Sequence, residues 1–597
     1  MTKICLGLLT LMVSGPFLLP FHTEPIPSFW NEWWAGALGL TATAAGLFAG
    51  RDRLRLSLLL IIPALLLVTL LLQFVFGRLA FPQIGLLYAV YLLWAGLLMV
   101  LGRYLADTVG LARLADVLAA AVALGATIGA AVALVQWLGI ADKVPWVFSN
   151  PDGRVYANLG QANHYAHYSW VGIASLFYLR SRGWFSRPLL WLPVVLIGFG
   201  SVLSGSRSVF LYPLVLLAAV AWARHREPHG AAAKLLVDAS LLLPVLVALS
   251  FVGTWAAPRI PEFWAWLGIT ISGGATATSA GRLYTEVSGP SIRVALMRTA
   301  WSAFAEHPWL GQGAGNYSWA SFVAAAGQTD ASQFMVAEHA HSFVFHLLAE
   351  FGAPAAFAVI SLLVFWARNF LRQQWTLTHA WCAAVLGMGA VHSMLEYPLW
   401  YGYFLGPTAL LLGATDSGKA IILTGRRVAV YLLLAALAGA LILGNLRADY
   451  SEIEVATYQP LAAHPDRERA WRITIEGLLK LHRESLLSPW VLMAFTNLAE
   501  PGRDLAQERA DLCERGIRFA PARSLLTRCA MQLAIAGRDA EAQNLLLSIA
   551  RAFPAERKAT SDELAKAAGK FPEIEPLLQL SLGKQGAKPE ARVHALP

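Results

Sequence analysis

The stretch His339-Ala-His-Ser-Phe-Val-Phe-His-Leu-Leu-Ala-Glu-Phe-Gly352 places polar side chains at the start of an apolar run that continues to residue 367. We expect this run to form one membrane-spanning helix that begins at His341. Four positions then share one helical face: His341, Phe345, Leu348 and Gly352. On that face, Gly352 lets a neighbouring helix come close. A lone histidine here also has a simple explanation, because water and lipid headgroups satisfy its ring at the membrane boundary.

The composition predicts a protein with many membrane-spanning helices. Of the 597 residues 57% are hydrophobic and 14% are charged, and the mean hydropathy is +0.54. This is too apolar for a soluble protein. The net charge of +9 comes from short basic clusters between apolar runs, an arrangement that sets membrane topology. We therefore expect membrane lipids as partners and no nucleic acid.

Apolar runs long enough to cross a bilayer predict an all-α protein with about 13 transmembrane helices. The expected spans are residues 4–21, 34–49, 58–76, 84–101, 117–140, 164–179, 188–204, 208–223, 235–257, 341–367, 377–395, 398–415 and 428–445. The first run resembles a signal peptide, but no small-residue cleavage site follows it. We interpret it as an uncleaved first helix.

The distribution of Lys and Arg predicts the orientation of these helices. With a cytoplasmic N-terminus, the inner loops carry most of the basic residues: Lys3, Arg51, Arg53, Arg55, Arg103, Arg113, Arg180, Arg182, Arg187, Arg224, Arg226, Lys234, Arg368, Arg372, Lys419, Arg426 and Arg427. The short outer loops carry only Arg78, Lys143, Arg154 and Arg207. This pattern follows the positive-inside rule, and it predicts a C-terminal segment outside the cytoplasm.

With that orientation the unusual polar stretches share the outer side, as an active site would require. These stretches are Gly160-Gln-Ala-Asn-His164, Ser204-Gly-Ser-Arg-Ser208, a long loop over residues 258–340, and His392-Ser-Met-Leu-Glu-Tyr-Pro398. We accordingly divide the membrane part into N-terminal helices at 1–257, the loop at 258–340 and C-terminal helices at 341–446.

From residue 447 the composition becomes that of a soluble helical domain. Residues 524–554 have the paired-helix rhythm of a tetratricopeptide (TPR) unit, with small apolar residues, a glycine turn and a closing proline. We predict a TPR-like helical domain at 447–582, with a plain helical cap as the alternative, and a disordered tail at 583–597. Of the four cysteines, only Cys513 and Cys529 could plausibly pair, and none shows metal-ligand spacing.

Two glycine-rich stretches are not nucleotide sites. In Gly413-Ala-Thr-Asp-Ser-Gly-Lys-Ala420, Ala420 replaces the Ser or Thr that a P-loop needs for magnesium, and a membrane helix precedes it instead of a strand. Gly311-Gln-Gly-Ala-Gly315 lacks the dinucleotide-binding spacing and is expected to be a tight turn. No Asp-x-Asp pair of the metal-dependent glycosyltransferase kind occurs, so we expect neither a metal nor a cofactor.

Charged and polar residues at the membrane boundary are the remaining candidates. Arg207 lies in a short hairpin where an unpaired charge would cost on the order of 2.5 to 3.5 kcal/mol, which suggests a function. Arg293 opens an amphipathic helix and, alone, is more typical of a solvated charge. Asn163 and His164 start a membrane helix as caps or headgroup contacts. His392 and Glu396 stand four residues apart on one helical face, so they could orient each other.

Several of these motifs resemble a known family. Pro308-Trp-Leu-Gly-Gln-Gly-Ala-Gly-Asn-Tyr317, followed by His341-Ser, nine residues and Gly352, resembles the signature of the Wzy/WaaL superfamily of polyprenyl-pyrophosphate-dependent glycan ligases and polymerases. Residues 20–32, 160–164 and 392–400 are similar to the PglL-type bacterial protein O-oligosaccharyltransferases. One departure is Ala355, where the ligase signature usually has Gly, Thr or Tyr.

The resemblance implies a reaction on the periplasmic side of the inner membrane. An acceptor hydroxyl of a pilin or other periplasmic protein attacks the anomeric carbon of an oligosaccharide linked to undecaprenyl pyrophosphate. His341 would be the general base, because an imidazole can accept a hydroxyl proton at neutral pH. Arg207 and Arg293 would bind the pyrophosphate. Glu396, Asn163 and His164 would orient the donor sugar or the acceptor.

Three other functions stay open at this point. An O-antigen ligase or polymerase would use lipid A-core or another glycan as acceptor. A transporter or flippase would need charges along a path through the bilayer, whereas this chain concentrates its polar residues on one side. A scaffold that recruits partners through its outer helical domain would not depend on His341.

Overall fold

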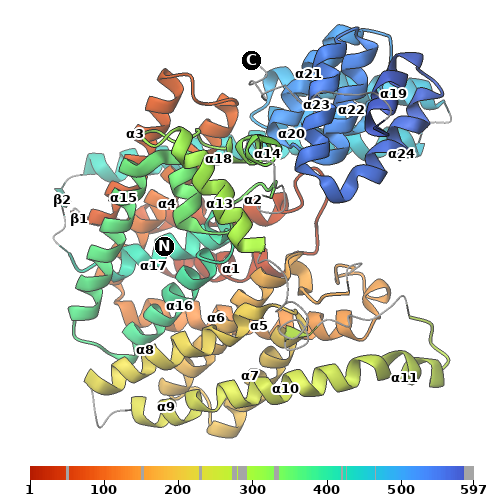
Figure 1. The fold of residues 1–597 in the computed structure, drawn as a ribbon. Coiled ribbons are helices and arrows are strands. Elements are labelled where there is room, and N and C mark those ends of the chain that lie inside the picture. The colour runs from red at the N-terminus through yellow and green to blue at the C-terminus, as the bar shows by residue number, and fades with distance from the viewer. Residues whose placement is uncertain are drawn as a thin grey trace. The chain divides into compact units, whose positions relative to one another are not determined.

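The computed structural model describes residues 1–48, 53–149, 153–226, 231–271, 278–279, 292–327, 335–418, 421–424, 426–463 and 466–583. These residues are almost entirely helical (Figure 1), which confirms the all-α class. The chain divides into two units. The first contains Met1–Pro63, Tyr91–Gly289 and Ile360–Leu443, and the second contains Ala64–Val90, Pro290–Val359 and Gly444–Pro597.

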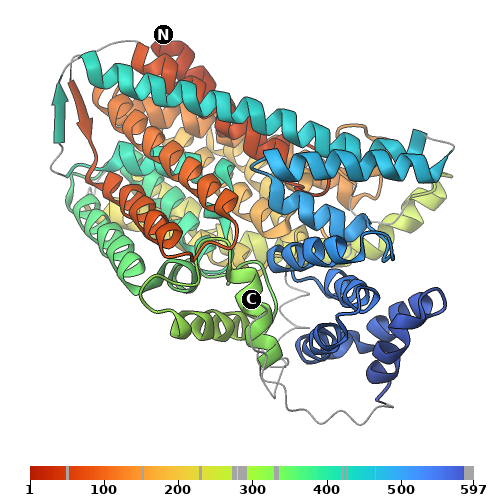
Figure 2. The same ribbon diagram turned by 90° about the horizontal axis from the view of Figure 1, so that it is seen from above.

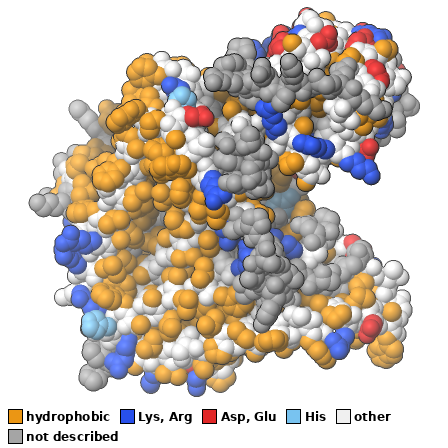
Figure 3. Space-filling model, in the orientation of Figure 1, with side chains coloured by type: hydrophobic (Ala, Val, Ile, Leu, Met, Phe, Trp, Pro, Cys, Tyr) orange, Lys and Arg blue, Asp and Glu red, His pale blue; other side chains and the backbone are white. Residues whose placement is uncertain are grey.

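Seven helical segments among the described residues are long and apolar enough to cross a membrane, as judged by length and composition: Leu58–Val75, Pro82–Thr108, Leu111–Trp137, Arg207–Arg226, Ala232–Trp266, Phe343–Arg372 and Val430–Thr457. Two shorter apolar segments are Thr2–Leu18 and Arg187–Leu203. The number of 13 crossings stays a prediction. Hydrophobic side chains cover much of the left of the face drawn in Figure 3, over α15 (Phe343–Arg372) and its neighbours. Exposed Phe357, Val364 and Phe365 on α15 suit contact with lipid.

The first unit is a bundle of helices around α6 (Ala162–Ser181). It also contains the end of α15 and the following complete elements: α1 (Thr2–Met12), α2 (Phe29–Phe48), α5 (Leu111–Trp137), α7 (Arg187–Leu203), α8 (Tyr212–Arg226), α9 (Ala232–Ser240), α10 (Leu242–Ala256), α11 (Ile260–Trp266), α16 (Leu377–Ser393), α17 (Gly402–Thr415), and the paired strands β1 (Arg53–Leu56) and β2 (Ile421–Thr424). Helices α5, α7 and α16 pack on α6. From His164 to Leu179, every residue of α6 is buried. An enclosed helix need not be as apolar as one that faces lipid, so α6 can carry polar side chains.

Helices α4 (Pro82–Thr108) and α17 approach each other at two glycines. A Cβ atom at Gly102 would meet the Leu410 carbonyl, and a Cβ atom at Gly413 would meet the Met99 carbonyl. Beyond α17, the Asp416 carboxylate accepts hydrogen bonds from the Ser57 hydroxyl, at 2.6 Å, and from the Leu58 amide, at 3.1 Å. The P-loop-like stretch at residues 413–420 therefore contributes to helix packing and to a turn. Its Lys419 and Ala420 lie outside the described residues.

The second unit combines parts of the membrane region with the C-terminal helices. It contains most of α3 (Ile61–Val75), the start of α4, α13 (Ile292–Glu306), α14 (Tyr317–Gly327), the first half of α15 and the end of α18 (Arg426–Ala463). The C-terminal helices follow: α19 (Arg467–Glu484), α20 (Ser488–Leu498), α21 (Ala506–Phe519), α22 (Arg523–Ile535), α23 (Asp539–Ala552), α24 (Arg557–Ala568) and α25 (Glu575–Ser581). Figure 2 shows α18 as a long helix leading to this group.

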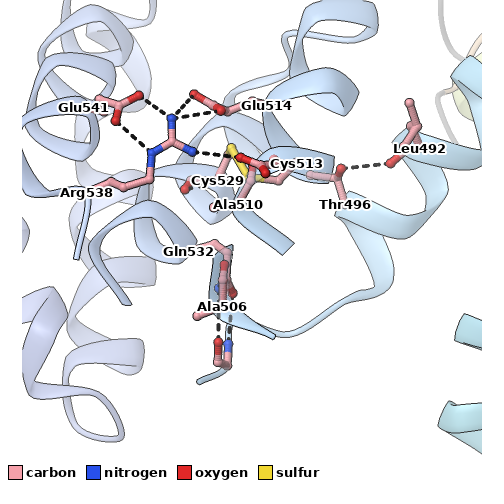
Figure 4. The surroundings of a disulfide bond; sticks show 12 residues. Leu492, Thr496, Ala506, Ala510, Cys513, Glu514, Cys529, Gln532, Arg538 and Glu541 are labelled. Carbon is pink, nitrogen blue, oxygen red and sulfur yellow. Dashed lines mark hydrogen bonds and ion pairs between the residues drawn. A yellow bond between two sulfur atoms is a disulfide. The ribbon is translucent and has the colours of Figure 1, made fainter. Parts of the chain in front are cut away.

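Consecutive helices from α19 to α23 pack against each other, as do α24 and α25, while assignment to the TPR type stays a prediction. Cys513 on α21 and Cys529 on α22 form a disulfide (Figure 4), the pair that the sequence left as the plausible one. Beside it, Arg538 forms ion pairs with Glu541 and with Glu514, the latter at 3.0 Å. The core of these helices also takes in Phe322 of α14, which lies in the predicted long loop. Most of the predicted tail, residues 584–597, lies outside the described residues.

Candidate functional site

His341 lies just before α15 in a left-handed backbone conformation. Its φ angle is +48°, whereas α15 begins at Phe343. The prediction that His341 starts the helix, on one face with Gly352, is therefore wrong. A non-glycine residue in this region of φ costs energy, and such residues concentrate at functional sites when the surrounding structure holds them. The His341 side chain is half-buried between buried Ala340 and Ser342.

A buried histidine holds the backbone immediately before His341. The Ala340 amide donates a hydrogen bond of 3.2 Å to Nδ1 of His346, one turn into α15. Since Nδ1 accepts this bond, the His346 proton lies on Nε2, and Nε2 is 3.4 Å from Oε1 of Glu350. His346 and Glu350 are 2% and 1% exposed, so this pair is enclosed by protein. The turn that carries His341 is thus tied to two buried side chains.

Glu350 in turn holds the glycine-rich turn at 311–315. Its Oε1 accepts a 2.9 Å hydrogen bond from the Gly315 amide, and its Oε2 accepts a 3.1 Å hydrogen bond from the Tyr88 hydroxyl. The side chain of Gln73 on α3 completes the arrangement. It donates to the carbonyl oxygens of Leu310 and Glu350, both at 2.7 Å, and accepts from the Ala314 amide at 3.1 Å.

Gly352 breaks α15 at the place where the same turn docks. It has φ +78° and ψ 174°, so the segment consists of two helices joined at a kink. A Cβ atom at Gly352 would meet the carbonyl of Trp309. Gly311, Gly313 and Gly315 have φ angles of +72°, +99° and +77°, which confirms the tight turn. We expected a neighbouring helix to come close to Gly352; this was wrong, because the backbone of the turn comes close instead.

Arg293 is the second residue of α13, which confirms the predicted helix, and its side chain is half-buried. Three residues on, the Leu296 carbonyl accepts a 3.3 Å hydrogen bond from the Tyr317 hydroxyl. The Tyr317 ring packs on His346, with 4.9 Å between centroids. The helix that carries Arg293 and the turn that carries His341 are therefore anchored to the same buried side chains within the second unit.

Four other candidates lie in the first unit, and two of them meet directly. The Asn163 side-chain amide donates a 2.6 Å hydrogen bond to Oε1 of Glu396. Glu396 is 4% exposed. The expectation that His392 and Glu396 share a helical face was wrong, because α16 ends at Ser393. Nδ1 of His392 instead lies 3.2 Å from the Tyr212 hydroxyl.

His164 is neither a cap nor a headgroup contact. Its side chain is 1% exposed, with its ring 4.9 Å from that of Tyr401 and 5.3 Å from that of His392. The cap of α6 is Gln161, whose side-chain oxygen accepts a 2.6 Å hydrogen bond from the His164 amide. Asn163 is also not a cap. The polar start of α6 thus faces the protein interior.

The three stretches that resemble the PglL-type enzymes come together here. The ring nitrogens of His22 lie 2.8 Å from the Asn158 carbonyl oxygen and 2.9 Å from that of Pro27. The Glu32 carboxylate accepts hydrogen bonds from the Tyr91 hydroxyl, at 2.9 Å, and from the Gly402 amide, at 2.5 Å. Together with the Asn163–Glu396 contact, these bonds join the stretch 20–32 to residues in or next to the stretches 160–164 and 392–400, namely Asn158, Asn163, Glu396 and Gly402.

Arg207 begins the short turn between α7 and α8, as the hairpin predicts, and is half-buried. The side chains of Ser204, Ser206 and Ser208 around it are buried. Arg154 donates a 3.2 Å hydrogen bond to the Ser204 carbonyl, so a second guanidinium reaches this turn. We did not single out Arg154 from the sequence, where it is one basic residue in a predicted outer loop.

The candidates therefore fall into two groups, one in each unit. His341 and Arg293 belong to the second unit, and Arg207, Asn163, His164 and Glu396 to the first. Within the described part of the chain, no group of three or more His, Cys, Asp or Glu side chains is arranged to hold a metal ion. The sequence analysis assigned no role to Gln73, His346 or Glu350. The available signal for Glu350 was its charge inside an apolar run.

Comparisons with known proteins indicate the class of enzyme. A family model described as O-antigen ligase matches residues 192–360, which contain Arg207, Arg293 and His341. A second model, the C-terminal part of the virulence factor membrane-bound polymerase, matches residues 380–568. A protein named general O-oligosaccharyltransferase from Acinetobacter baylyi (strain ATCC 33305 / BD413 / ADP1) is 26% identical over 483 residues, which are 79% of this chain and 80% of that protein.

The chain is thus a membrane enzyme of the glycosyltransferase type, similar to the O-antigen ligases. Its resemblance within that class is to the PglL-type protein O-oligosaccharyltransferases of the Wzy/WaaL superfamily, as the short motifs predict.

Proposed function

We propose that this enzyme transfers a preassembled oligosaccharide from undecaprenyl pyrophosphate to Ser or Thr hydroxyls of pilin or other periplasmic proteins. It lies in the bacterial inner membrane with its N-terminus in the cytoplasm and its active site and C-terminal domain in the periplasm. The observation that carries the proposal is the left-handed backbone of His341, fixed by the buried His346 and Glu350. Backbone strain of this kind is found at functional sites, where it holds a side chain in a defined orientation.

In this reaction His341 accepts the proton of the acceptor hydroxyl as its oxygen attacks the anomeric carbon of the donor. The new carbon–oxygen bond forms while the bond from the anomeric carbon to the pyrophosphate breaks. Arg207 and Arg293 bind the pyrophosphate and stabilise the negative charge that grows on it, because the planar guanidinium matches phosphate oxygens. Undecaprenyl pyrophosphate leaves, and His341 returns its proton to water.

The cluster around Asn163 and Glu396 suits recognition of the sugar or the acceptor. A carboxylate accepts hydrogen bonds and a side-chain amide both donates and accepts them, so the two groups together can bind several hydroxyls at once. His164 supports this cluster through its contact with Tyr401. Glu396→Gln keeps the shape of the side chain and removes its charge, so it should raise KM for one substrate while leaving the protein folded.

The decisive experiment compares His341→Ala with His225→Ala in the purified enzyme, with lipid-linked oligosaccharide and pilin as substrates. His225 is an exposed residue near the end of α8. We expect His341→Ala to lose at least the 100-fold or so that a general base contributes. His225→Ala should transfer at the wild-type rate. Full transfer by His341→Ala would exclude the mechanism.

A second pair of variants tests the phosphate contact. Arg207→Ala should lose use of the donor far more than Arg207→Lys, since lysine keeps the charge but not the bidentate fork. Equal activities of the two variants would argue against bidentate binding of the pyrophosphate.

The match to the O-antigen ligase model favours one alternative, transfer to lipid A-core or to another glycan. The same assay separates the two functions. Transfer to lipid A-core without transfer to pilin would establish the ligase, whereas mass spectrometry of glycosylated pilin peptides would establish the protein transferase.

A further inference from the structure

A cavity of about 560 Å³ opens where the C-terminal ends of α8 and α15 meet in the first unit. Its walls include Trp222, Arg226, Val364, Arg368, Leu371 and Arg372. In Figure 1 these helix ends lie at the lower left, and the same corner of Figure 3 carries Lys, Arg and His side chains beside hydrophobic ones. The cavity therefore combines three guanidinium groups with an apolar wall.

The three arginines differ from other arginines that the sequence places on the same side of the membrane. Arg182 pairs with Asp116 at 2.9 Å, and Arg187 pairs with Asp238 at 2.8 Å. Arg226, Arg368 and Arg372 have no such carboxylate within ion-pair distance among the described residues. One amino group of Arg226 donates a 2.9 Å hydrogen bond to the Gln373 carbonyl, and the three side chains are exposed. The cavity thus presents positive charge that no carboxylate of the described residues neutralises.

The apolar wall indicates what kind of anion fits. Trp222 is 39% exposed, Leu371 is 43% exposed and Val364 is 62% exposed, and all three line the cavity. The indole ring of Trp222 lies 6.2 Å from that of Trp375. Tryptophan is enriched where hydrocarbon meets headgroups, and both helices lead from this point into apolar segments. A free phosphate would use the charges but gain nothing from this wall.

We propose that this cavity binds an anionic phospholipid. The headgroup phosphate lies among Arg226, Arg368 and Arg372, and an acyl chain runs along Leu371 and Val364. Basic pockets between transmembrane helices on the cytoplasmic side bind lipid headgroups in this way. The lipid fastens the end of α8 to the end of α15. The site is independent of His341 and of the proposed transfer reaction.

The test measures phospholipid binding to the full-length, delipidated protein in detergent by native mass spectrometry. Phosphatidylglycerol is the probe, and phosphatidylcholine with the same acyl chains is the reference. Arg368→Gln/Arg372→Gln is compared with Arg224→Gln/Lys234→Gln, which removes two positive charges from α8 and α9 outside the cavity wall. Each basic side chain near an anionic headgroup contributes about fivefold, so the cavity variant should bind phosphatidylglycerol roughly 30-fold more weakly. The control variant should bind like the wild type.

Three outcomes would contradict the proposal that the cavity binds an anionic phospholipid. Equal weakening in both double variants would show general attraction between charges, and phosphatidylcholine bound as tightly as phosphatidylglycerol would exclude recognition of the headgroup. Displacement of the lipid by soluble glycerol phosphate would identify a free phosphate as the ligand and overturn the proposal. If Arg368→Gln/Arg372→Gln melts below the wild type, Trp222→Ala replaces it. This variant should weaken binding at least fivefold, and unchanged binding would refute the site.

Discussion

Replacement of Glu350 is the sharpest test of how His341 is held. The carboxylate accepts hydrogen bonds from the Gly315 amide and the Tyr88 hydroxyl, and it lies 3.4 Å from Nε2 of His346. Glu350→Ala leaves these three donors without this partner in a region where Glu350 itself is 1% exposed. Each buried unsatisfied group costs about 1 to 3 kcal/mol. We therefore expect Glu350→Ala to lower the free energy of unfolding by about 3 to 6 kcal/mol.

Glu350→Gln separates stability from positioning. Glutamine keeps one oxygen for the Gly315 amide but turns an amino group toward another donor, so the cost falls to about 1 to 3 kcal/mol. Since Glu350 orients His346, and His346 holds the Ala340 amide, His341 should be aimed less well in this variant. We expect kcat for transfer to fall while KM for the donor stays near the wild-type value.

The assay is thermal unfolding in detergent together with transfer kinetics, and Glu262→Ala on the surface of α11 is the control. The melting temperature should fall most for Glu350→Ala, less for Glu350→Gln and not for the control. Wild-type melting and wild-type turnover in Glu350→Ala would refute the reasoning. A loss of kcat in Glu350→Gln that simply follows the loss of folded protein would leave Glu350 with a structural role only.

Three further outcomes follow from other parts of the chain. Gly352→Ala should destabilise the fold by about 1 to 3 kcal/mol or more, because of its left-handed φ and the adjacent Trp309 carbonyl, whereas Gly389→Ala, with no atom within 4 Å of the new Cβ, should be neutral or stabilising in thermal melts. Cys529→Ser opens a disulfide with a sequence separation of 16, so it should cost about 2 to 4 kcal/mol. A reductant should lower the melting temperature of the wild type but not of this variant. Burial, and then the charge of Arg78, lower the pKa of His307, so its protonation opposes folding. Stability should fall as the pH drops below about 6.5, and His307→Gln should flatten that decline in a pH series of melts.

The sequence predicted what depends on local pattern. Hydropathy gave the helical class, the amphipathic pattern after Arg293 predicted α13, and glycine spacing predicted the turn at 311–315. Each of these follows from neighbouring residues, because side-chain periodicity and backbone freedom are local properties. Elimination among four cysteines left Cys513 and Cys529 as the one plausible pair, and the structure shows that they form a disulfide.

The errors at His341 and Gly352 came from extending one local pattern too far. The apolar run is continuous, so periodicity predicts one helix through both residues, yet tertiary contacts hold one residue outside the helix and break it at the other. Gln73 contacts Leu310 and Glu350, which are 237 and 277 positions away in the sequence. Hydrophobic periodicity cannot predict contacts over such separations. The same holds for Asn163 and Glu396, which are 233 positions apart. A polar residue in an apolar run is visible from sequence, but its partner is not.

The break at Gly352 also explains why the glycine-rich turn and the His-Ser-x9-Gly spacing occur in one protein. A helix broken in an apolar environment exposes carbonyl and amide groups that must find other partners. The freed carbonyls of Ala349 and Glu350 accept from the amides of Gln312, at 2.8 Å, and Gly313, at 3.2 Å, while the Ala353 amide donates to the Pro308 carbonyl at 2.7 Å. The turn thus serves as the cap of a broken helix, and only glycine permits its approach. His341 stands two residues before that helix begins, with its neighbour tied through His346 to the carboxylate that binds the turn. Replacing any of these glycines by a larger residue should therefore change the position of His341, although the new side chain does not contact it.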